Sequence, residues 1–177
     1  MQTNCIGPHF ICLSEHHLKE SEINNLAFMG YKLATDFCRK KSLGGGVCIL
    51  SNNKLSYSTV NLNQYCQEKT LEICTVKLHF KSLKLIIFCV YRSPTGNLNF
   101  FFNLLENILN KFVQPNVTFL ICGDLNINLL AKSKAASKLL TFMNTCNLSQ
   151  VVDFPTRRNN NEGTLTDVIF VDTRIYD

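Results

Sequence analysis

The 177-residue sequence lacks the features that would assign it directly to several common classes of protein. It has no apolar run near the ~20 residues that a membrane-spanning helix needs. The first residues, Met1 to Pro8, show neither the basic flank nor the apolar segment of a signal peptide. We therefore expect an intracellular protein with no membrane partner. Internal repeats and low-complexity linkers are also absent from the sequence, and its length fits one domain.

Charge and cysteine usage set further limits. The 18 Lys and Arg outnumber the 13 Asp and Glu by five, a mild excess spread along the chain that is compatible with a polyanionic partner. The nine cysteines include no CxxC pair, and most lie in apolar segments, namely Cys12, Cys48, Cys74, Cys89 and Cys122. We interpret them as small buried hydrophobic residues in a reducing compartment, rather than as a disulfide framework or a zinc site.

The stretch at residues 117–128 organises the rest of the chain. Val117 to Cys122 is an apolar run between Pro115 and Gly123, which predicts a strand buried on both faces. Asp124 and Asn126 then follow the carboxyl end of this strand, the usual place for ligand chemistry in α/β sheets. This pattern indicates a metal or phosphate site, and an ordinary turn is the alternative because Asp and Asn also fill turns.

The other predicted elements alternate along the chain. Strands are expected at residues 9–14, 31–37, 47–50, 54–60, 71–80, 84–90, 151–152 and 164–171, and helices at 21–28, 98–112 and 133–146, the first two capped by Ser21 and Asn97. Residues 154–158 read as a turn and 159–163 as a polar loop. Gly44 to Gly46 match no phosphate-binding loop, since GxxxxGK[ST] and GxGxxG are both absent, so they predict a tight lead into a strand.

Asp167 stands out in the last of these strands, among Leu165, Val168 and Ile169. An unpaired acid in an apolar strand costs several kcal/mol. We therefore expect the Asp167 carboxylate to have an interaction partner, and an active site would provide one.

Five segments in order carry a resemblance to a known family: Cys12-Leu-Ser-Glu15-His-His-Leu, Gly45-Gly-Val-Cys-Ile, Val90-Tyr91-Arg92-Ser-Pro94, Gly123-Asp124-Leu-Asn126 and Thr164-Leu-Thr-Asp167-Val-Ile-Phe. The chain resembles the endonuclease/exonuclease/phosphatase family over nearly all of its length. More narrowly, it is similar to the endonuclease domain of jockey-like and LINE-like non-LTR retrotransposons. The resemblance implies an α/β fold, a four-layer sandwich of two mostly antiparallel sheets flanked by helices.

The resemblance also implies a chemistry, the hydrolysis of phosphate esters with the help of Mg²⁺ or Mn²⁺. It makes Glu15 the metal anchor and Tyr91, Asp124, Asn126 and Asp167 catalytic residues. Tyr91 would donate its hydroxyl to a phosphate oxygen, and Asp124 would position or deprotonate the attacking water. Substrate binding would fall to Arg92, Thr156 and Thr164, with an ordinary surface arginine as the alternative for Arg92.

The sequence departs from the family at both ends. Members begin with a strand that bears an Asn and end with a Ser-Asp-His strand, and neither is found here. We therefore expect a single domain over residues 1–177, truncated at both ends and impaired in catalysis.

Two functional readings stay open. In the first, the chain nicks DNA in the nucleus and belongs to a longer parent protein with a reverse transcriptase domain. In the second, it is a non-catalytic remnant with weak metal or nucleic-acid binding. A phosphatase of the same fold is disfavoured by the match of residues 91–94 and 123–126 to the transposon branch.

Overall fold

The computed structural model describes residues 7–159 and 162–175. The strands are β1 Phe10–Ser14, β2 Tyr31–Phe37, β3 Val47–Asn52, β4 Ser58–Thr59, β5 Glu72–His79, β6 Lys84–Tyr91, β7 Val117–Asp124, β8 Leu148–Gln150, β9 Arg157–Asn159, β10 Glu162–Thr164 and β11 Asp167–Asp172. The helices are α1 Glu20–Ile23, α2 Leu98–Asn110 and α3 Lys134–Thr145, with short 3-10 turns at Asn63–Tyr65 and Thr173–Ile175. Most of the N-terminal segment 1–8 and part of the predicted loop 159–163 lie outside the described residues.

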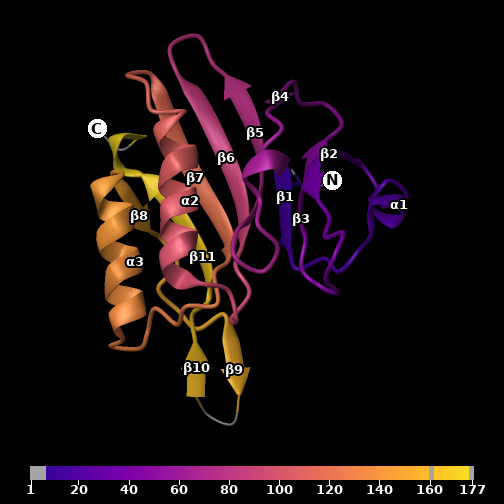
Figure 1. Ribbon diagram of the computed structural model, residues 1–177. Helices are drawn as coiled ribbons and strands as arrows, with labels where there is room; N and C mark the ends of the chain where they lie inside the picture. Colours follow the sequence, from indigo (N-terminus) through magenta and orange to yellow (C-terminus); the bar gives the residue numbers. More distant parts are fainter. Residues whose placement is uncertain (1–6, 160–161, 176–177) are drawn as a thin grey trace, which may run out of the picture.

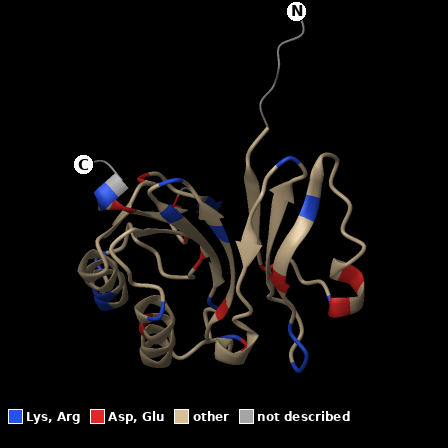
Figure 2. Ribbon diagram, turned by 90° about the horizontal axis from the view of Figure 1, so that it is seen from above, with Lys and Arg blue, Asp and Glu red and all other residues tan. Residues whose placement is uncertain are grey.

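The described strands form two sheets and a separate hairpin. The larger sheet has the order β4-β5-β6-β7-β11-β8, the smaller one has the order β1-β3-β2, and β9 pairs with β10. Within these sheets β6 and β7 are parallel, and the other paired strands are antiparallel. The two sheets face each other, and α2 and α3 cover the outer side of the larger sheet (Figures 1 and 2). The predicted fold class is thereby confirmed: α/β, with two mostly antiparallel sheets and helices outside.

Two apolar layers hold the larger sheet in place. Between this sheet and the helices lies a core in which Phe88, Phe101, Leu105, Ile121 and Phe170 are fully buried. A second core between the two sheets contains Val47, Ile49, Cys74, Val76, Ile87, Cys89 and Tyr91. On the far side of the smaller sheet, α1 and its neighbouring loop bury Ile23 against Cys48. None of the helices in the described part of the chain is both long and apolar enough to cross a membrane.

Local signals explain the long helices and the central strand. The side chain of Asn97 accepts a hydrogen bond from the main-chain N–H of Phe100, and Ser133 accepts one from Ala136, so each caps the first turn of its helix. Strand β7 lies between β6 and β11, as expected for its apolar run. The predictions for these three elements are confirmed.

Three short elements differ from the sequence-based predictions. Only Ser58–Thr59 of the predicted strand 54–60 pairs with β5, because the segment is mostly exposed and buries little apolar surface. The strand predicted at 151–152 lies earlier, at Leu148–Gln150. Helix α1 begins at Glu20 and not after Ser21, because the Glu22 carboxylate accepts the main-chain N–H of Lys19 at 2.7 Å.

The predicted turn and loop at residues 154–163 instead contain the β9–β10 hairpin, which extends from one end of the sandwich (Figure 1). Its strands are polar, so no alternation of apolar residues in the sequence indicates them.

The cysteine prediction holds in part. Cys48, Cys74 and Cys89 are buried in the sheets, and the eight described cysteines are all free thiols. Cys12 and Cys122 are only half-buried.

Candidate active site

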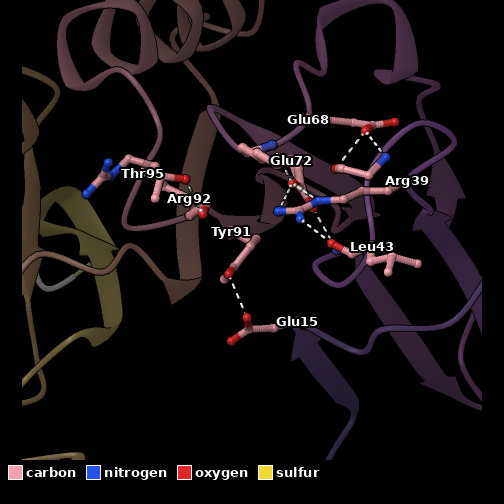
Figure 3. Close-up of polar contacts among 12 residues, drawn as sticks. Glu15, Arg39, Leu43, Glu68, Glu72, Tyr91, Arg92 and Thr95 are labelled. Carbon is pink, nitrogen blue, oxygen red and sulfur yellow. Dashed lines mark hydrogen bonds and ion pairs between the residues drawn. The ribbon is translucent and has the colours of Figure 1, made fainter.

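Glu15 and Tyr91 connect the two sheets at one end of the sandwich. Tyr91 is the last residue of β6, and its hydroxyl donates a hydrogen bond of 2.7 Å to Oε1 of Glu15, the residue directly after β1 (Figure 3). Burial is the main cause that raises the pKa of Tyr91, and the hydrogen bond to Glu15 raises it further. The phenol therefore stays protonated and acts as a donor. Glu15 has a left-handed φ of 58°, which the hydrogen bond from its main-chain N–H to the Gly46 carbonyl (2.7 Å) helps to hold.

A buried ion pair supports both residues from behind, and sequence reasoning missed it. Glu72 is fully buried and lies opposite Tyr91 in the β5–β6 register. Its Oε1 accepts the Nε–H of Arg39 at 2.6 Å and its Oε2 accepts the main-chain N–H of Gly46 at 2.6 Å (Figure 3). The Arg39 guanidinium also lies over the Tyr91 ring, 5.6 Å from its centre. The acid at position 72, inside the strand predicted at 71–80, was the available signal in the sequence.

Asp124 and Asn126 form a second pair at the end of β7. Asp124 is 1% exposed, and its Oδ1 accepts the main-chain N–H of Asn126 at 2.9 Å. The Asn126 amide donates to Asp124 Oδ2 at 3.2 Å and to the Arg92 carbonyl at 2.9 Å, with its backbone in the left-handed region at φ 50°. Burial raises the pKa of Asp124, and the hydrogen bond from Asn126 only partly opposes it.

Arg157 binds both site aspartates, and the sequence contained no signal for it. Its Nη2 lies 2.6 Å from Asp124 Oδ2 and its Nε lies 3.7 Å from Asp167 Oδ2. The β9–β10 hairpin brings this guanidinium over the end of the larger sheet, with half of the side chain exposed. The expectation that Asp167 has a partner is confirmed, but its carboxylate is 43% exposed and not buried in the strand.

The three residues predicted to bind substrate have different surroundings. The Arg92 side chain is buried and donates to the carbonyls of Leu125, Gly96 and Asn126, so it holds the loop that follows β7. The prediction that Arg92 reaches the nucleic-acid backbone gains no support from this geometry, and the surface-arginine alternative is wrong. Thr156 Oγ1 accepts the main-chain N–H of Asp167 at 3.3 Å, and Thr164 pairs with Arg157 in the hairpin.

Strand pairing brings the predicted catalytic residues together. Asp124 lies opposite Tyr91 on one neighbouring strand and opposite Asp167 on the other. The charges of Asp167 and Glu15 both act on the carboxyl group of Asp124 and raise its pKa, so Glu15 belongs to the same electrostatic cluster. The sequence predicted these four residues and Asn126, and the structure places them at one end of the sandwich.

The donor atoms suit a hard divalent cation. Glu15 offers a carboxylate that is 36% exposed, and Asp167, opposite Asp124 in the strand register, offers one that is 43% exposed. No arrangement of three or more His, Cys, Asp or Glu side chains that could hold a metal occurs within residues 7–159 and 162–175. The partly exposed carboxylate of Glu15 is an oxygen donor of the kind that fits a hard cation anchored by a single side chain.

The two facing sheets, with acids, a phenol and an amide at one end, define the endonuclease/exonuclease/phosphatase fold. Residues 85–177, which are 93 of the 177, match the endonuclease-reverse transcriptase family. The chain therefore belongs to this family. No match is found among curated protein sequences.

Several solved structures share the fold. The endonuclease domain of TRAS1, a telomere-specific non-LTR retrotransposon, superposes with a TM-score of 0.70 at 12% identity over 96% of this chain and 74% of that chain. The 3' phosphatase NExo from Neisseria, bound to a product DNA hairpin, gives 0.65 at 16% identity, over 96% and 78%. TDP2 from D. rerio, complexed with a single-strand DNA product, gives 0.60 at 11% identity, over 93% and 71%. At these identities the likeness shows the fold alone.

Proposed function

We propose that the chain is the DNA-nicking endonuclease domain of a retrotransposon-derived protein and that it hydrolyses phosphodiester bonds with Mg²⁺ or Mn²⁺. The observation that carries the proposal is the hydrogen bond between Tyr91 and Glu15. It lies at the same end of the sandwich as the contact between Asp124 and Asn126. Family membership supports hydrolysis of phosphate esters, and the DNA in the structures of NExo and TDP2 supports a nucleic-acid substrate. Acting on DNA, the protein would work in the nucleus, next to a reverse transcriptase domain of a longer parent protein.

In this proposal Glu15 holds the cation and Tyr91 fixes the orientation of its carboxylate. A divalent cation bound there would neutralise charge on a phosphate oxygen and polarise the phosphorus–oxygen bond. Asp124, whose pKa is raised by burial, takes or positions a proton of the attacking water. Asn126 holds the Asp124 carboxylate through its main-chain N–H and its side-chain amide.

Arg157 has two roles in this scheme. In the free protein its guanidinium occupies Asp124 Oδ2, so Asp124 becomes available to water only when Arg157 moves. A phosphate group competes for the guanidinium because arginine forms strong paired hydrogen bonds with phosphate oxygens. Substrate binding would therefore draw Arg157 away from Asp124 and release the carboxylate for catalysis.

A second candidate function is non-catalytic binding of metal or nucleic acid. In the part of the chain that the structure describes, no histidine forms a hydrogen bond or ion pair with Asp124 or Asp167. General acid–base groups such as histidine commonly contribute factors of about 10² to 10⁴ to a rate. We therefore propose slow hydrolysis as the main candidate function and binding without hydrolysis as the alternative.

The two candidates differ in a plasmid-nicking experiment. The 177-residue protein is incubated with supercoiled DNA and Mg²⁺ or Mn²⁺, beside Glu15→Ala and a matched control, Glu106→Ala, which removes an exposed acid on α2. We expect slow nicking that EDTA and Glu15→Ala abolish and that Glu106→Ala leaves unchanged. Mn²⁺ binding without nicking, lost in Glu15→Ala, would favour the binding role. If the protein shows no nicking and no Mn²⁺ binding that depends on Glu15, both candidates are rejected.

A further inference from the structure

Four cysteines meet between the two sheets, in a place that the proposed chemistry does not use. Cys74, Cys89 and Cys122 lie side by side in register on β5, β6 and β7. Cys12 comes from β1 in the facing sheet and packs against the same core layer. The thiol of Cys89 donates to the carbonyl of Leu13, next to Cys12, at 3.5 Å. A row of three thiols on one sheet thus faces a fourth thiol on the other.

The four thiols differ in their access to solvent. Cys74 and Cys89 are 2% and 0% exposed. Cys12 and Cys122 are half-buried and both line one cavity of about 670 Å³ between the sheets. The cavity walls are largely apolar, with Phe10, Leu120 and Ile169 among the lining residues. Small neutral molecules can therefore reach Cys12 and Cys122 but not the inner pair.

Cys12 is the thiol with the strongest thiolate character in this group. The neighbouring side chains of Cys122 and then Cys89 hold the pKa of Cys12 below its ordinary value, although burial opposes this. The pKa of Cys122 is raised, mainly by its hydrogen bond to Cys12. Cys12 from β1 and Cys122 from β7 therefore line the same cavity from facing sheets, with Cys12 as the nucleophile and Cys122 as the second thiol.

We propose that Cys12 and Cys122 are an oxidant-sensitive modification site that forms a reversible disulfide between the two sheets. The oxidant class is a peroxide small enough to enter the cavity. The Cys12 thiolate attacks one peroxide oxygen and the O–O bond breaks, which forms a sulfenic acid on Cys12. The departing hydroxide takes up a proton and becomes water. The Cys122 sulfur then attacks the Cys12 sulfur, the S–O bond breaks, and the second hydroxide leaves as water with the Cys122 proton. Two thiols lose two electrons, and one peroxide becomes two waters.

The strands that carry the two thiols approach each other across the sheets, with Cα atoms of β1 and β7 within 8 Å. A disulfide needs Cα atoms about 4.4 to 6.8 Å apart. Strand β1 is the edge strand of the smaller sheet among the described strands and lines the cavity, so only one neighbouring strand in its sheet holds it.

Oxidation would act directly beneath the candidate active site. Cys12 precedes Glu15 by three residues on β1, and Cys122 precedes Asp124 by two residues on β7. The disulfide therefore ties the strand that leads to the proposed metal anchor to the strand that carries Asp124. The inference rests on the cavity and on the thiols and does not depend on the chain being a nuclease.

The experiment maps the bond in the whole 177-residue chain. The reduced protein is treated with an equimolar amount of hydrogen peroxide, free thiols are alkylated, and the digest is analysed by mass spectrometry. We expect one dominant cross-linked pair of peptides, containing Cys12 and Cys122, that disappears after treatment with dithiothreitol. Cys122→Ser should abolish the cross-link and leave Cys12 as a sulfenic or sulfinic acid.

Two variants test the choice of partner. Cys89→Ser removes the other thiol that contacts Cys12, and Cys146→Ser removes a half-buried thiol of the α3 region; both should retain the cross-link. A cross-link from Cys12 mainly to Cys89, or full alkylation of Cys12 and Cys122 after peroxide treatment, would overturn the proposal. Mapping in the unsubstituted protein does not require any variant to fold.

Discussion

The Tyr91 hydroxyl lies 2.7 Å from Oε1 of Glu15 and joins the end of β6 to the residue that follows β1. The contact crosses from one sheet to the other, so it depends on how the sheets pack. Behind it, the buried Arg39–Glu72 pair holds the Tyr91 ring and, through Gly46, the main chain of Glu15. The proposed metal anchor is therefore held in place from two directions before any cation binds.

Tyr91→Phe removes this hydroxyl and keeps the ring. We expect a loss of Mn²⁺ affinity of about tenfold, the lower range for removing a group that orients a metal ligand. The free energy of unfolding should fall by only about 1 kcal/mol, the usual net value of one hydrogen bond. Isothermal titration and urea unfolding measure the two effects. Tyr31→Phe is the control, because it removes a hydroxyl of β2 that donates to the Pro8 carbonyl, ahead of β1. Unchanged Mn²⁺ affinity in Tyr91→Phe would contradict the role given to Tyr91.

Arg157→Ala leaves the buried Asp124 carboxylate without its cation. We expect a loss of stability of about 1 kcal/mol at pH 7, modest because half of the arginine side chain is exposed to solvent. The raised pKa of Asp124 means that folding favours its protonated form, and removing Arg157 raises this pKa further. The difference between the two proteins should therefore be present at pH 7 and be lost as pH falls through the raised pKa of Asp124, which lies above the ordinary value of 3.8.

Urea unfolding at pH 7 and at a pH below 3.8 measures this difference in stability between the wild type and Arg157→Ala. Arg158→Ala, at the next and equally exposed position of β9, should change nothing. An equal loss in the Arg158 variant would show that the hairpin strand, and not the contact with Asp124, is responsible.

Glu68→Gln tests the loop between β2 and β3. The Glu68 carboxylate accepts the main-chain N–H groups of Lys40, Lys41 and Ser42 at 2.7, 2.9 and 2.9 Å. Burial alone would raise the pKa of Glu68, but these hydrogen bonds outweigh it and lower the pKa from 4.5 to about 2. The stabilisation is present above pH 4.5 and is lost as pH falls through about 2. We expect Glu68→Gln to cost about 1 to 2 kcal/mol at pH 7.

The loss in Glu68→Gln should shrink between pH 4.5 and about 2. Chemical denaturation across that interval measures it, with Glu106→Gln on α2 as the matched control. A difference that stays constant with pH would argue against the charged carboxylate as the cause.

Gly123→Ala would place a methyl group in the centre of the larger sheet. Its Cβ would lie 1.9 Å from the Val90 carbonyl oxygen, and Gly123 has a left-handed φ of 137°. We expect a loss of more than about 3 kcal/mol, or failure to fold, because backbone and not a flexible side chain is in the way. Gly30→Ala is the control: at φ 82° it has nothing within 4 Å, so only backbone strain of about 1 to 2 kcal/mol applies. Thermal unfolding separates the two, and equal losses would rule out the clash.

Much of the fold was predictable where local signals and burial agree. The apolar run of β7, the cap of α2 at Asn97 and the glycines before β3 each specify their structure over a few residues. The β9–β10 hairpin and the short strands β4 and β8 were not predictable in this way. They are held by pairing with partners that no local pattern identifies, and their side chains are largely polar or exposed.

The same distinction between local signals and tertiary contacts applies to the candidate site. By itself, the sequence determined that Asp124 and Asn126 lie at the carboxyl end of a buried strand, because an apolar run ending in glycine dictates that locally. The tertiary structure alone decided that Arg157 neutralises Asp124 and that Arg39 and Glu72 support Tyr91. It also decided that Glu15, 109 residues before Asp124, acts on the same carboxyl group. The physical reason is that the pairing of strands and the packing of sheets bring together charges whose spacing along the chain carries no information about their distance in space.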